Sequence, residues 1–206
     1  MKKIIKSVVC LFVSLIFILS AVACKGPVSD DEAKEIMKDL LVKETSLTAY
    51  VYGDAFELAD KSEYDAHKDD GTFYYAKVSK DSPYTTKKEL SDALSAVYTD
   101  SVMEEINVFA FSGSNETEGY TVIPRFYQSP KEDRLSIDVT SYGIYDLKSV
   151  IIIDTLTVNR STASMMEVTV SYRPDVDKDT REMKIKAIKV DGTWKLDTRT
   201  WAVGVE

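Results

Sequence analysis

The sequence has little histidine and little cysteine, and these shortages exclude most familiar catalytic centres. His67 is the only histidine, and Cys10 and Cys24 are the only cysteines, in 206 residues. A Ser-His-Asp triad or a Cys-His pair would have to use His67, which lies in the polar stretch DAHKDD. A zinc site built from several histidines and cysteines is excluded by the count. Glycine patterns of the P-loop or dinucleotide-binding type are absent as well, so we predict no metal and no cofactor.

Positive charge is also in short supply. The chain has 26 Lys and Arg against 34 Asp and Glu, which gives a net charge of −8. Contacts with phosphates need a basic surface, so the charge balance excludes nucleic acid as a partner recognised by bulk charge. The same acidity disfavours adhesion to anionic lipid except through a covalent anchor. Enzymes that use only carboxylates remain open, because acidic residues are abundant.

The first residues have the features of an export signal. A basic cluster, Lys2, Lys3 and Lys6, precedes a run from residue 7 to residue 24 that has no charged side chain. The run closes with small residues, which a signal peptidase requires near its cleavage site. The alternative is an uncleaved transmembrane anchor, since the run is close to the minimum length that spans a bilayer.

The tetrapeptide Ala21-Val22-Ala23-Cys24 resembles the lipobox of bacterial lipoproteins. The resemblance covers about the first 24 residues, with Ala21 where that family prefers leucine. It implies that the Cys24 thiol carries a diacylglyceryl group, and that cleavage makes Cys24 the first residue. Each buried methylene contributes about 0.8 kcal/mol, so two or more acyl chains hold a protein stably on a lipid membrane. The resemblance therefore implies an extracytoplasmic, membrane-anchored lipoprotein of the cell envelope.

The domain organisation follows from these boundaries. We expect residues 1–23 to be the signal peptide, residues 24–30 a lipidated tether and residues 31–206 a single α+β domain. After removal of the signal, Cys24 is the only cysteine left. The exported domain would therefore contain no disulfide and would depend on its hydrophobic core.

The first half of the domain has the patterns of helices. A capping box of Ser29 and Glu32 predicts a helix that begins at Ser29 and ends before Gly53. A second capping pair, Thr86 and Glu89, predicts another helix, and a third begins near residues 99–100. We expect residues 60–72 and 112–118 to be loops, with a short strand over residues 73–78.

From residue 120 the apolar residues alternate with a period of two, which is typical of strands. A first strand is predicted over residues 120–127, with Pro124 at an edge or bulge. The later strands are predicted at 135–140, 150–158, 166–172 and 183–190. Within residues 183–190 the apolar alternation changes phase, since Met183 and Ile185 share one face and Ile188 and Val190 share the other. This change predicts a β-bulge near Ala187. The pair Asp191-Gly192 predicts a two-residue hairpin turn before the last strand.

Helices followed by an antiparallel meander predict an α+β fold in which N-terminal helices pack on a strongly curved antiparallel sheet. The ending KAIKVDGTWKLDT resembles the last hairpin of the cystatin-like superfamily, which includes nuclear transport factor two. The order of helices and strands over residues 29–203 is also similar to that of the cystatin-like superfamily. The resemblance implies a cystatin-like cone fold. The stretch YTTKKELSDALSAVYTDSVMEEI, residues 84–106, is similar to the DL-endopeptidase inhibitor family, whose cystatin-like domains block cell-wall hydrolases.

Two sets of residues are candidates for a site. Tyr142, Ile144 and Tyr145 surround a glycine in a predicted hairpin tip, where they would bind a partner or fold back on the sheet. Asp154 interrupts the apolar strand VIIIDTL. The cone-fold resemblance implies that an acid inside the cavity acts as a general base, while the alternative is that Asp154 faces solvent.

These patterns together favour a non-catalytic binding module that inhibits or modulates a cell-wall hydrolase. The alternative is a small enzyme or ligand carrier that uses the cavity of the cone, with Asp154 as its acid or base. A third hypothesis is a domain that supports assembly of a larger envelope complex.

Overall fold

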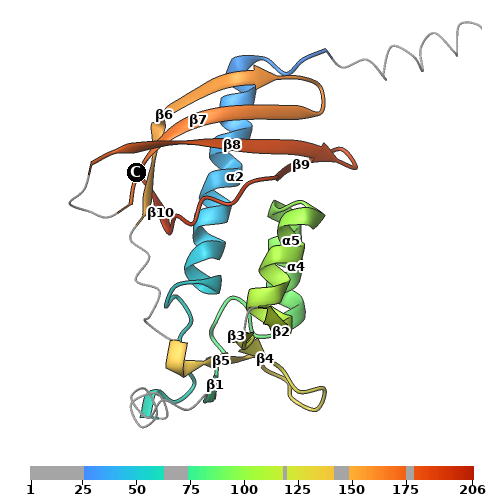
Figure 1. Cartoon of the computed structure of the whole chain (residues 1–206), viewed down its shortest axis with the longest axis vertical. Helices are drawn as coiled ribbons and strands as arrows, with labels where there is room; N and C mark the ends of the chain where they lie inside the picture. Colours follow the sequence, from blue (N-terminus) through green and yellow to red (C-terminus); the bar gives the residue numbers. More distant parts are fainter. Residues whose placement is uncertain (1–25, 63–73, 118–119, 142–148, 175–178) are drawn as a thin grey trace, which may run out of the picture.

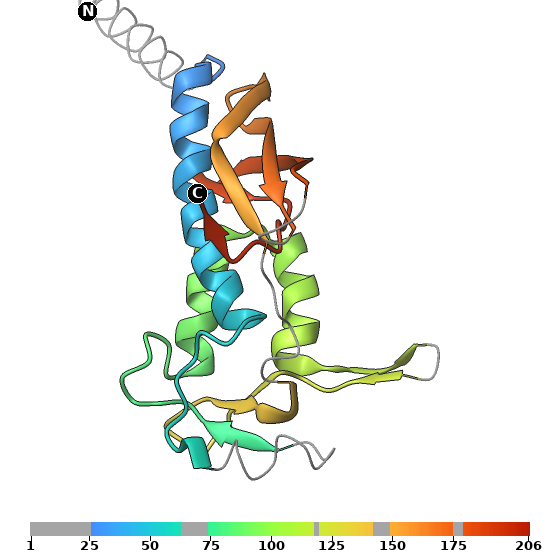
Figure 2. The same cartoon turned by 90° about the vertical axis from the view of Figure 1, so that its left-hand side faces the viewer.

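The computed structural model describes residues 26–62, 74–117, 120–141, 149–174 and 179–206. Cys24, His67 and the candidate tip residues Tyr142, Ile144 and Tyr145 lie outside these ranges. A long helix runs through the molecule, with a five-stranded sheet at one end and a three-stranded sheet at the other (Figures 1 and 2). Within the described residues, no helix is both long and apolar enough to cross a membrane.

The long helix, α2 (Asp30–Val51), begins where the sequence predicts. The Ser29 side chain accepts a hydrogen bond from the backbone N–H of Glu32 at 3.3 Å. The first turn is acidic, which stabilises the positive end of the helix dipole. Gly53 follows the end of the helix at a place too narrow for a side chain, because a Cβ there would lie 2.8 Å from the Ala49 carbonyl oxygen.

The five-stranded sheet curls around one part of α2 (Figure 2). Its strand order is β10-β6-β7-β8-β9, and neighbours are antiparallel except β10 and β6, which are parallel. The strands are β6 (Val150–Ser161), β7 (Met165–Arg173), β8 (Arg181–Val190), β9 (Thr193–Leu196) and β10 (Gly204–Val205). Alternate residues of β7, such as Val168 and Val170, are fully buried, so one face of the sheet contributes to the core.

The structure corrects the predicted bulge and confirms the predicted turn. β8 pairs with β7 without a register shift from Arg181 to Ile188, so the bulge near Ala187 is wrong. The phase slip has another cause: Ala187 is buried in the core while Ile188 is half-buried on the opposite face. The register shifts lie in β6 instead. The turn Asp191-Gly192 has φ angles of 49° and 84°, as a two-residue hairpin of this kind requires.

The three-stranded sheet has the order β1-β5-β4 and is antiparallel. Its strands are β1 (Tyr75–Lys77), β5 (Ser136–Asp138) and β4 (Phe126–Tyr127). The paired row Ala76, Ile137 and Phe126 is buried to within 1% and packs into the core. The neighbouring row therefore points to the other face of the sheet, because side chains alternate along each strand.

Further elements lie between β1 and β4 in the chain. Helices α4 (Lys87–Val97) and α5 (Asp100–Asn107) follow β1, and a π-helical turn, η1 (Val108–Ser112), leads out of α5. The segment predicted as a loop forms strand β2 (Ser114–Thr117), which pairs with β3 (Tyr120–Val122). The strand predicted over residues 120–127 is divided into β3 and β4, with Pro124 between them.

One hydrophobic cluster connects these parts. It contains residues of α2, α4 and α5 together with residues of the three-stranded and five-stranded sheets. The chain is therefore an α+β protein with a strongly curved, largely antiparallel sheet, as the sequence predicts at that level. β1 lies between α2 and α4 in the chain, where the sequence predicts a short strand over residues 73–78.

Candidate functional site

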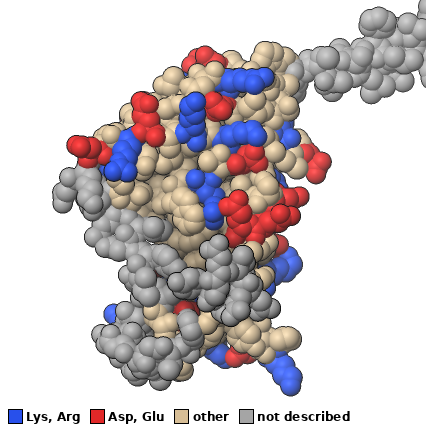
Figure 3. All heavy atoms as spheres, in the orientation of Figure 1, with Lys and Arg blue, Asp and Glu red and all other residues tan. Residues whose placement is uncertain are grey.

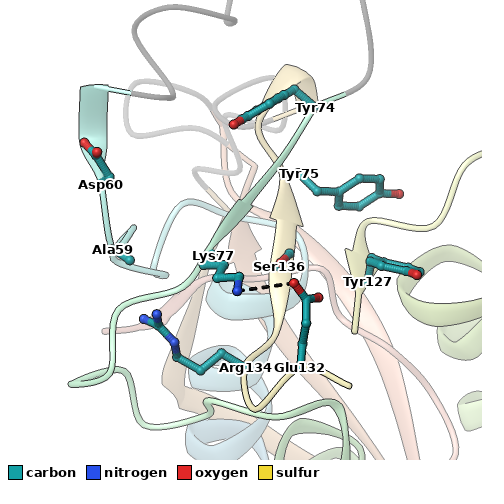
Figure 4. Close-up of a pocket in the computed structure, with 9 residues that line it drawn as sticks. All are labelled: Ala59, Asp60, Tyr74, Tyr75, Lys77, Tyr127, Glu132, Arg134 and Ser136. Carbon is teal, nitrogen blue, oxygen red and sulfur yellow. Dashed lines mark ion pairs between the residues drawn. The ribbon is translucent and has the colours of Figure 1, made fainter. Parts of the chain in front are cut away.

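A cavity of about 450 Å³ lies on the outer face of the three-stranded sheet (Figure 4). Three tyrosines, Tyr74, Tyr75 and Tyr127, supply its aromatic part. The other lining residues are Ala59, Asp60, Lys77, Glu132, Arg134 and Ser136. The volume lies within the range of sites that hold small molecules, which makes this cavity the candidate binding site.

Strand pairing brings the central lining residues together. Lys77 of β1 is paired with Ser136 of β5, which in turn is paired with Tyr127 of β4. Tyr75 precedes Lys77 by two residues and so points to the same face. Glu132 and Arg134 come from the segment that leads into β5. Residues far apart in the sequence therefore meet on one face, opposite the buried row that holds the sheet to the core.

The charged side chains of the cavity already have partners. The Lys77 Nζ lies 3.2 Å from a carboxylate oxygen of Glu132, and the two point toward each other across the centre of the site (Figure 4). Arg134 donates from Nη1 to the Val78 carbonyl oxygen at 3.1 Å. Hydrogen bonds from the side chain and backbone of Ser62 lower the pKa of Asp60. Each sign of charge is present twice, so the lining has no excess of either.

Arg134 keeps one donor without a partner. Its Nε is buried and has no hydrogen-bond partner within the described part of the chain. The Asp133 carboxylate lies 3.9 Å from this Nε, which is too far for a hydrogen bond. An unpaired buried donor is costly, and because this atom is buried it is not exposed to a ligand in the cavity.

The tyrosines form the other side of the cavity. The rings of Tyr75 and Tyr127 lie 5.8 Å apart with an angle of 50° between them. The Tyr75 hydroxyl donates to the Pro124 carbonyl oxygen. Burial, with a smaller contribution from Asp138, raises the pKa of Tyr75 to about 12, so its hydroxyl stays neutral. Tyr127 is 50% exposed and presents its ring to solvent.

The pKa shifts of Asp60 and Tyr75 suit the binding of a ligand better than the transfer of a proton. The pKa of Asp60 is lowered and the pKa of Tyr75 is raised, so both shifts move away from neutrality. A general acid or base needs a pKa near the working pH. The arrangement therefore offers fixed donors, fixed acceptors and aromatic rings to a ligand.

A second polar cluster lies in the core, outside this cavity. Glu44 of α2 is fully buried, and its Oε1 accepts from the Thr200 N–H at 2.7 Å and from the Tyr98 hydroxyl at 3.2 Å. The Thr200 hydroxyl donates to its other oxygen. Burial raises the pKa of Glu44 to about 7. The sequence analysis missed this residue, although its spacing from Met37 and Leu41 places it on the buried stripe of the helix.

Charged groups surround this cluster. Arg199 donates to the Tyr52 hydroxyl at 2.9 Å and to the Glu105 carboxylate at 2.8 Å. Its guanidinium also lies 4.1 Å from the ring centre of Trp201, which has a positive φ of 60°. Arg199 lowers the pKa of Glu44, but by less than burial raises it. The cluster ties α2 to the segment after β9, and we assign it a structural role.

Of the residues proposed from the sequence, the structure places Asp154 only. It is exposed and lies in the irregular part of β6 between Ile152 and Thr157. It does not line the cavity of Figure 4. This position agrees with the alternative in which Asp154 faces solvent. Within the described ranges, no group of three or more His, Cys, Asp or Glu side chains is placed to hold a metal ion.

Charges of both signs are interspersed on the face of the molecule shown in Figure 3. Over the five-stranded sheet, Lys and Arg side chains lie beside Asp and Glu side chains (Figure 3). Two ion pairs join strands of this sheet to the segments next to them, Lys186 with Asp197 at 2.7 Å and Arg173 with Glu206. The visible face therefore presents mixed charge to a partner.

Comparison with known proteins assigns no family to this arrangement. No protein-family model matches the chain, and no curated protein matches it in sequence.

Proposed function

We propose that this chain is an extracytoplasmic lipoprotein, anchored to a membrane through acylated Cys24, whose folded part is a non-catalytic binding module. We further propose that its partner is a cell-wall hydrolase, which it inhibits or modulates. The observation that carries the proposal is the position of the cavity relative to the tether. The tether leads into one end of α2, and the three-stranded sheet with its cavity lies at the other end (Figure 1).

The tether is held at its own end of the molecule. The Ser161 hydroxyl, at the end of β6, donates to the Val28 carbonyl oxygen at 2.8 Å. Residues Gly26 to Val28 also line a small cavity with Ala163 and Trp194. α2 has 22 residues and so spans about 33 Å. A chain anchored at Cys24 would hold this end near the lipid and present the tyrosine-lined cavity away from it.

The fold supports the proposal at a second level. We infer that the curled sheet with α2 against it is a variant of the cystatin-like cone to which the C-terminal hairpin has a resemblance. In this view, the three-stranded sheet with α4 and α5 is an addition at the membrane-distal end. The alternative of an enzyme with Asp154 as its base gains no support, because the Asp154 carboxylate is exposed.

The anchor is tested by replacing its attachment point. Wild-type protein should fractionate with membranes and give an acylated N-terminal peptide at Cys24 by mass spectrometry. Cys24→Ser should lose the acyl group, with the folded part unchanged by circular dichroism. Recovery of full-length, unacylated wild-type protein from the cytosol would refute the anchor.

The partner is tested with photo-crosslinking residues at two exposed positions. Lys131 lies at the cavity end, next to Glu132, and Ser164 lies at the tether end, next to Ala163. On intact cells, we expect a cell-wall hydrolase to be crosslinked from position 131 and not from position 164. Recovery of a hydrolase from position 164 alone, or from neither position, would contradict the proposal.

A further inference from the structure

The cavity on the three-stranded sheet also indicates the chemical class of its ligand. The ring of Tyr127 is half exposed and stands beside the ring of Tyr75, whose hydroxyl is occupied by the Pro124 carbonyl. Both rings therefore present flat, weakly polar surface, on which an apolar ligand face can pack. In Figure 4 the two rings lie on one side of the site, and the Lys77–Glu132 pair lies at its centre.

The charges argue against an ionic ligand of either sign. An anion would meet Asp60 and Glu132, and a cation would meet Lys77 and Arg134. The cations are also engaged already, Lys77 with Glu132 and Arg134 with the Val78 carbonyl. A charged ligand would have to break one of these contacts and leave a like charge nearby, which costs binding free energy. Charge complementarity therefore favours a neutral ligand.

The polar groups of the cavity include both donors and acceptors at short range. Lys77, Arg134 and Ser136 carry donors, and the carboxylates of Asp60 and Glu132 carry acceptors. A ligand that suits this set needs several groups that both donate and accept, together with a flat C–H face. Sugar hydroxyls on a pyranose ring have these properties.

From these features we infer that the cavity binds a neutral saccharide of one or two sugar units. The sugar face packs on Tyr127, and the hydroxyls bond to the polar groups of Lys77, Glu132 and Ser136. The volume of about 450 Å³ suits a ligand of this size. The inference rests on the proposed function only in treating the chain as a binding module; it needs neither the membrane anchor nor the hydrolase.

The test compares three sugars that differ mainly in charge. The full chain, in a detergent without a sugar headgroup, is titrated by calorimetry with N-acetylglucosamine, with glucosamine and with N-acetylglucosamine 6-phosphate. Maltose serves as a neutral disaccharide. We expect a neutral sugar to bind roughly tenfold more tightly than either charged one, because a charged group must displace an existing ion pair. Tighter or equal binding of a charged sugar, or no binding of either neutral sugar, overturns the inference.

Variants at the exposed tyrosine locate the binding. Tyr127→Ala should weaken binding of the neutral sugar roughly tenfold, and Tyr127→Phe, which keeps the ring, should stay within about threefold of wild type. Trp201→Ala removes an exposed aromatic residue that does not line the cavity, and it should leave the affinity unchanged. If Tyr127→Ala is folded and binds like wild type, the assignment is wrong.

The two proposals fail in different ways. Loss of sugar binding with intact acylation and hydrolase crosslinking would remove the saccharide site alone. Sugar binding that depends on Tyr127 in a chain that is neither acylated nor crosslinked would remove the proposed function and leave the site.

Discussion

At the scale of the residue, the carboxylate of Glu44 is fully buried and strongly desolvated. Desolvation disfavours its ionised form, and the hydrogen bonds from Thr200 and Tyr98 offset only part of this cost. The pKa is consequently raised from 4.5 to about 7. Folding therefore favours the protonated carboxyl, and the native state takes up a proton that the unfolded chain has already released in this range.

This shift predicts a pH dependence of stability. Below about pH 4.5 both states are protonated, and between about pH 4.5 and about pH 7 the free energy of unfolding should fall by roughly 3 kcal/mol as pH rises. Above about pH 7 this contribution is constant. Glu44→Gln keeps a neutral, hydrogen-bonding side chain and should remove that slope, as measured by urea unfolding at several pH values.

The matched control for this prediction is Asp154→Asn. It removes one negative charge from the exposed surface of β6 and should leave the pH slope as it is in wild type. An equal slope in wild type and in Glu44→Gln would show that the buried carboxylate does not control the pH dependence.

At the scale of the element, local signals located helix starts and turns, while the pairing of distant strands had to come from the structure. Ser29, Thr86 and the Asp191-Gly192 turn stand where capping and turn chemistry predicts them. These signals act within a few residues of the chain. The bulge near Ala187 was wrong, because alternation alone does not show that a strand is partly buried on both faces.

The candidate site was missed for a related reason. Its central residues come from three strands that are separated by up to about sixty positions, and no pattern within one strand indicates which others pair with it. One signal was present: Tyr75 and Lys77 flank Ala76, so they were bound to share the face opposite to the core. That alternation predicts an exposed aromatic and charged face but not the cavity.

The capping box of α4 gives a prediction at this scale. The Thr86 side chain accepts from the Glu89 N–H at 3.2 Å, and the Glu89 carboxylate accepts from the Thr86 N–H at 3.0 Å. Thr86→Ala should lower the free energy of unfolding by about 1 kcal/mol, because it leaves a helix N–H without its partner. Thr86→Ser keeps the hydroxyl, and its free energy of unfolding should differ from that of wild type by only a few tenths of 1 kcal/mol. Equal stability of the alanine and serine variants in urea unfolding would contradict this role.

At the scale of the whole molecule, the two ends of α2 have different surroundings. The tether, Ser161 and Trp194 lie at one end, and the three-stranded sheet lies at the other. With an anchor at Cys24, the end of the molecule that holds residues 26–28 would face the lipid, and the three-stranded sheet would face away from the membrane. The orientation follows from the packing of residues 26–28 against the end of the curled sheet.

This orientation predicts a difference in distance from the membrane. Single fluorophores are attached at Ser164→Cys and at Lys131→Cys in acylated protein on vesicles that carry a lipid-linked acceptor. Energy transfer should be more efficient from position 164 than from position 131, since α2 separates the two ends by about 33 Å. Equal transfer from both positions would show that the molecule lies flat or turns freely on its tether.

The strand β10 has a consequence for biosynthesis. It pairs with β6, while Thr200, just before it, completes the hydrogen bonds of Glu44 on α2. A nascent chain that has emerged only as far as β9 can pack α2 against β6, α4 and β9, but it lacks β10 and the hydrogen bonds that Thr200 donates to the Glu44 carboxylate. Both hydrogen bonds from Thr200 to Glu44, and the pairing of β10 with β6, therefore form only after residues 200–205 have been synthesised.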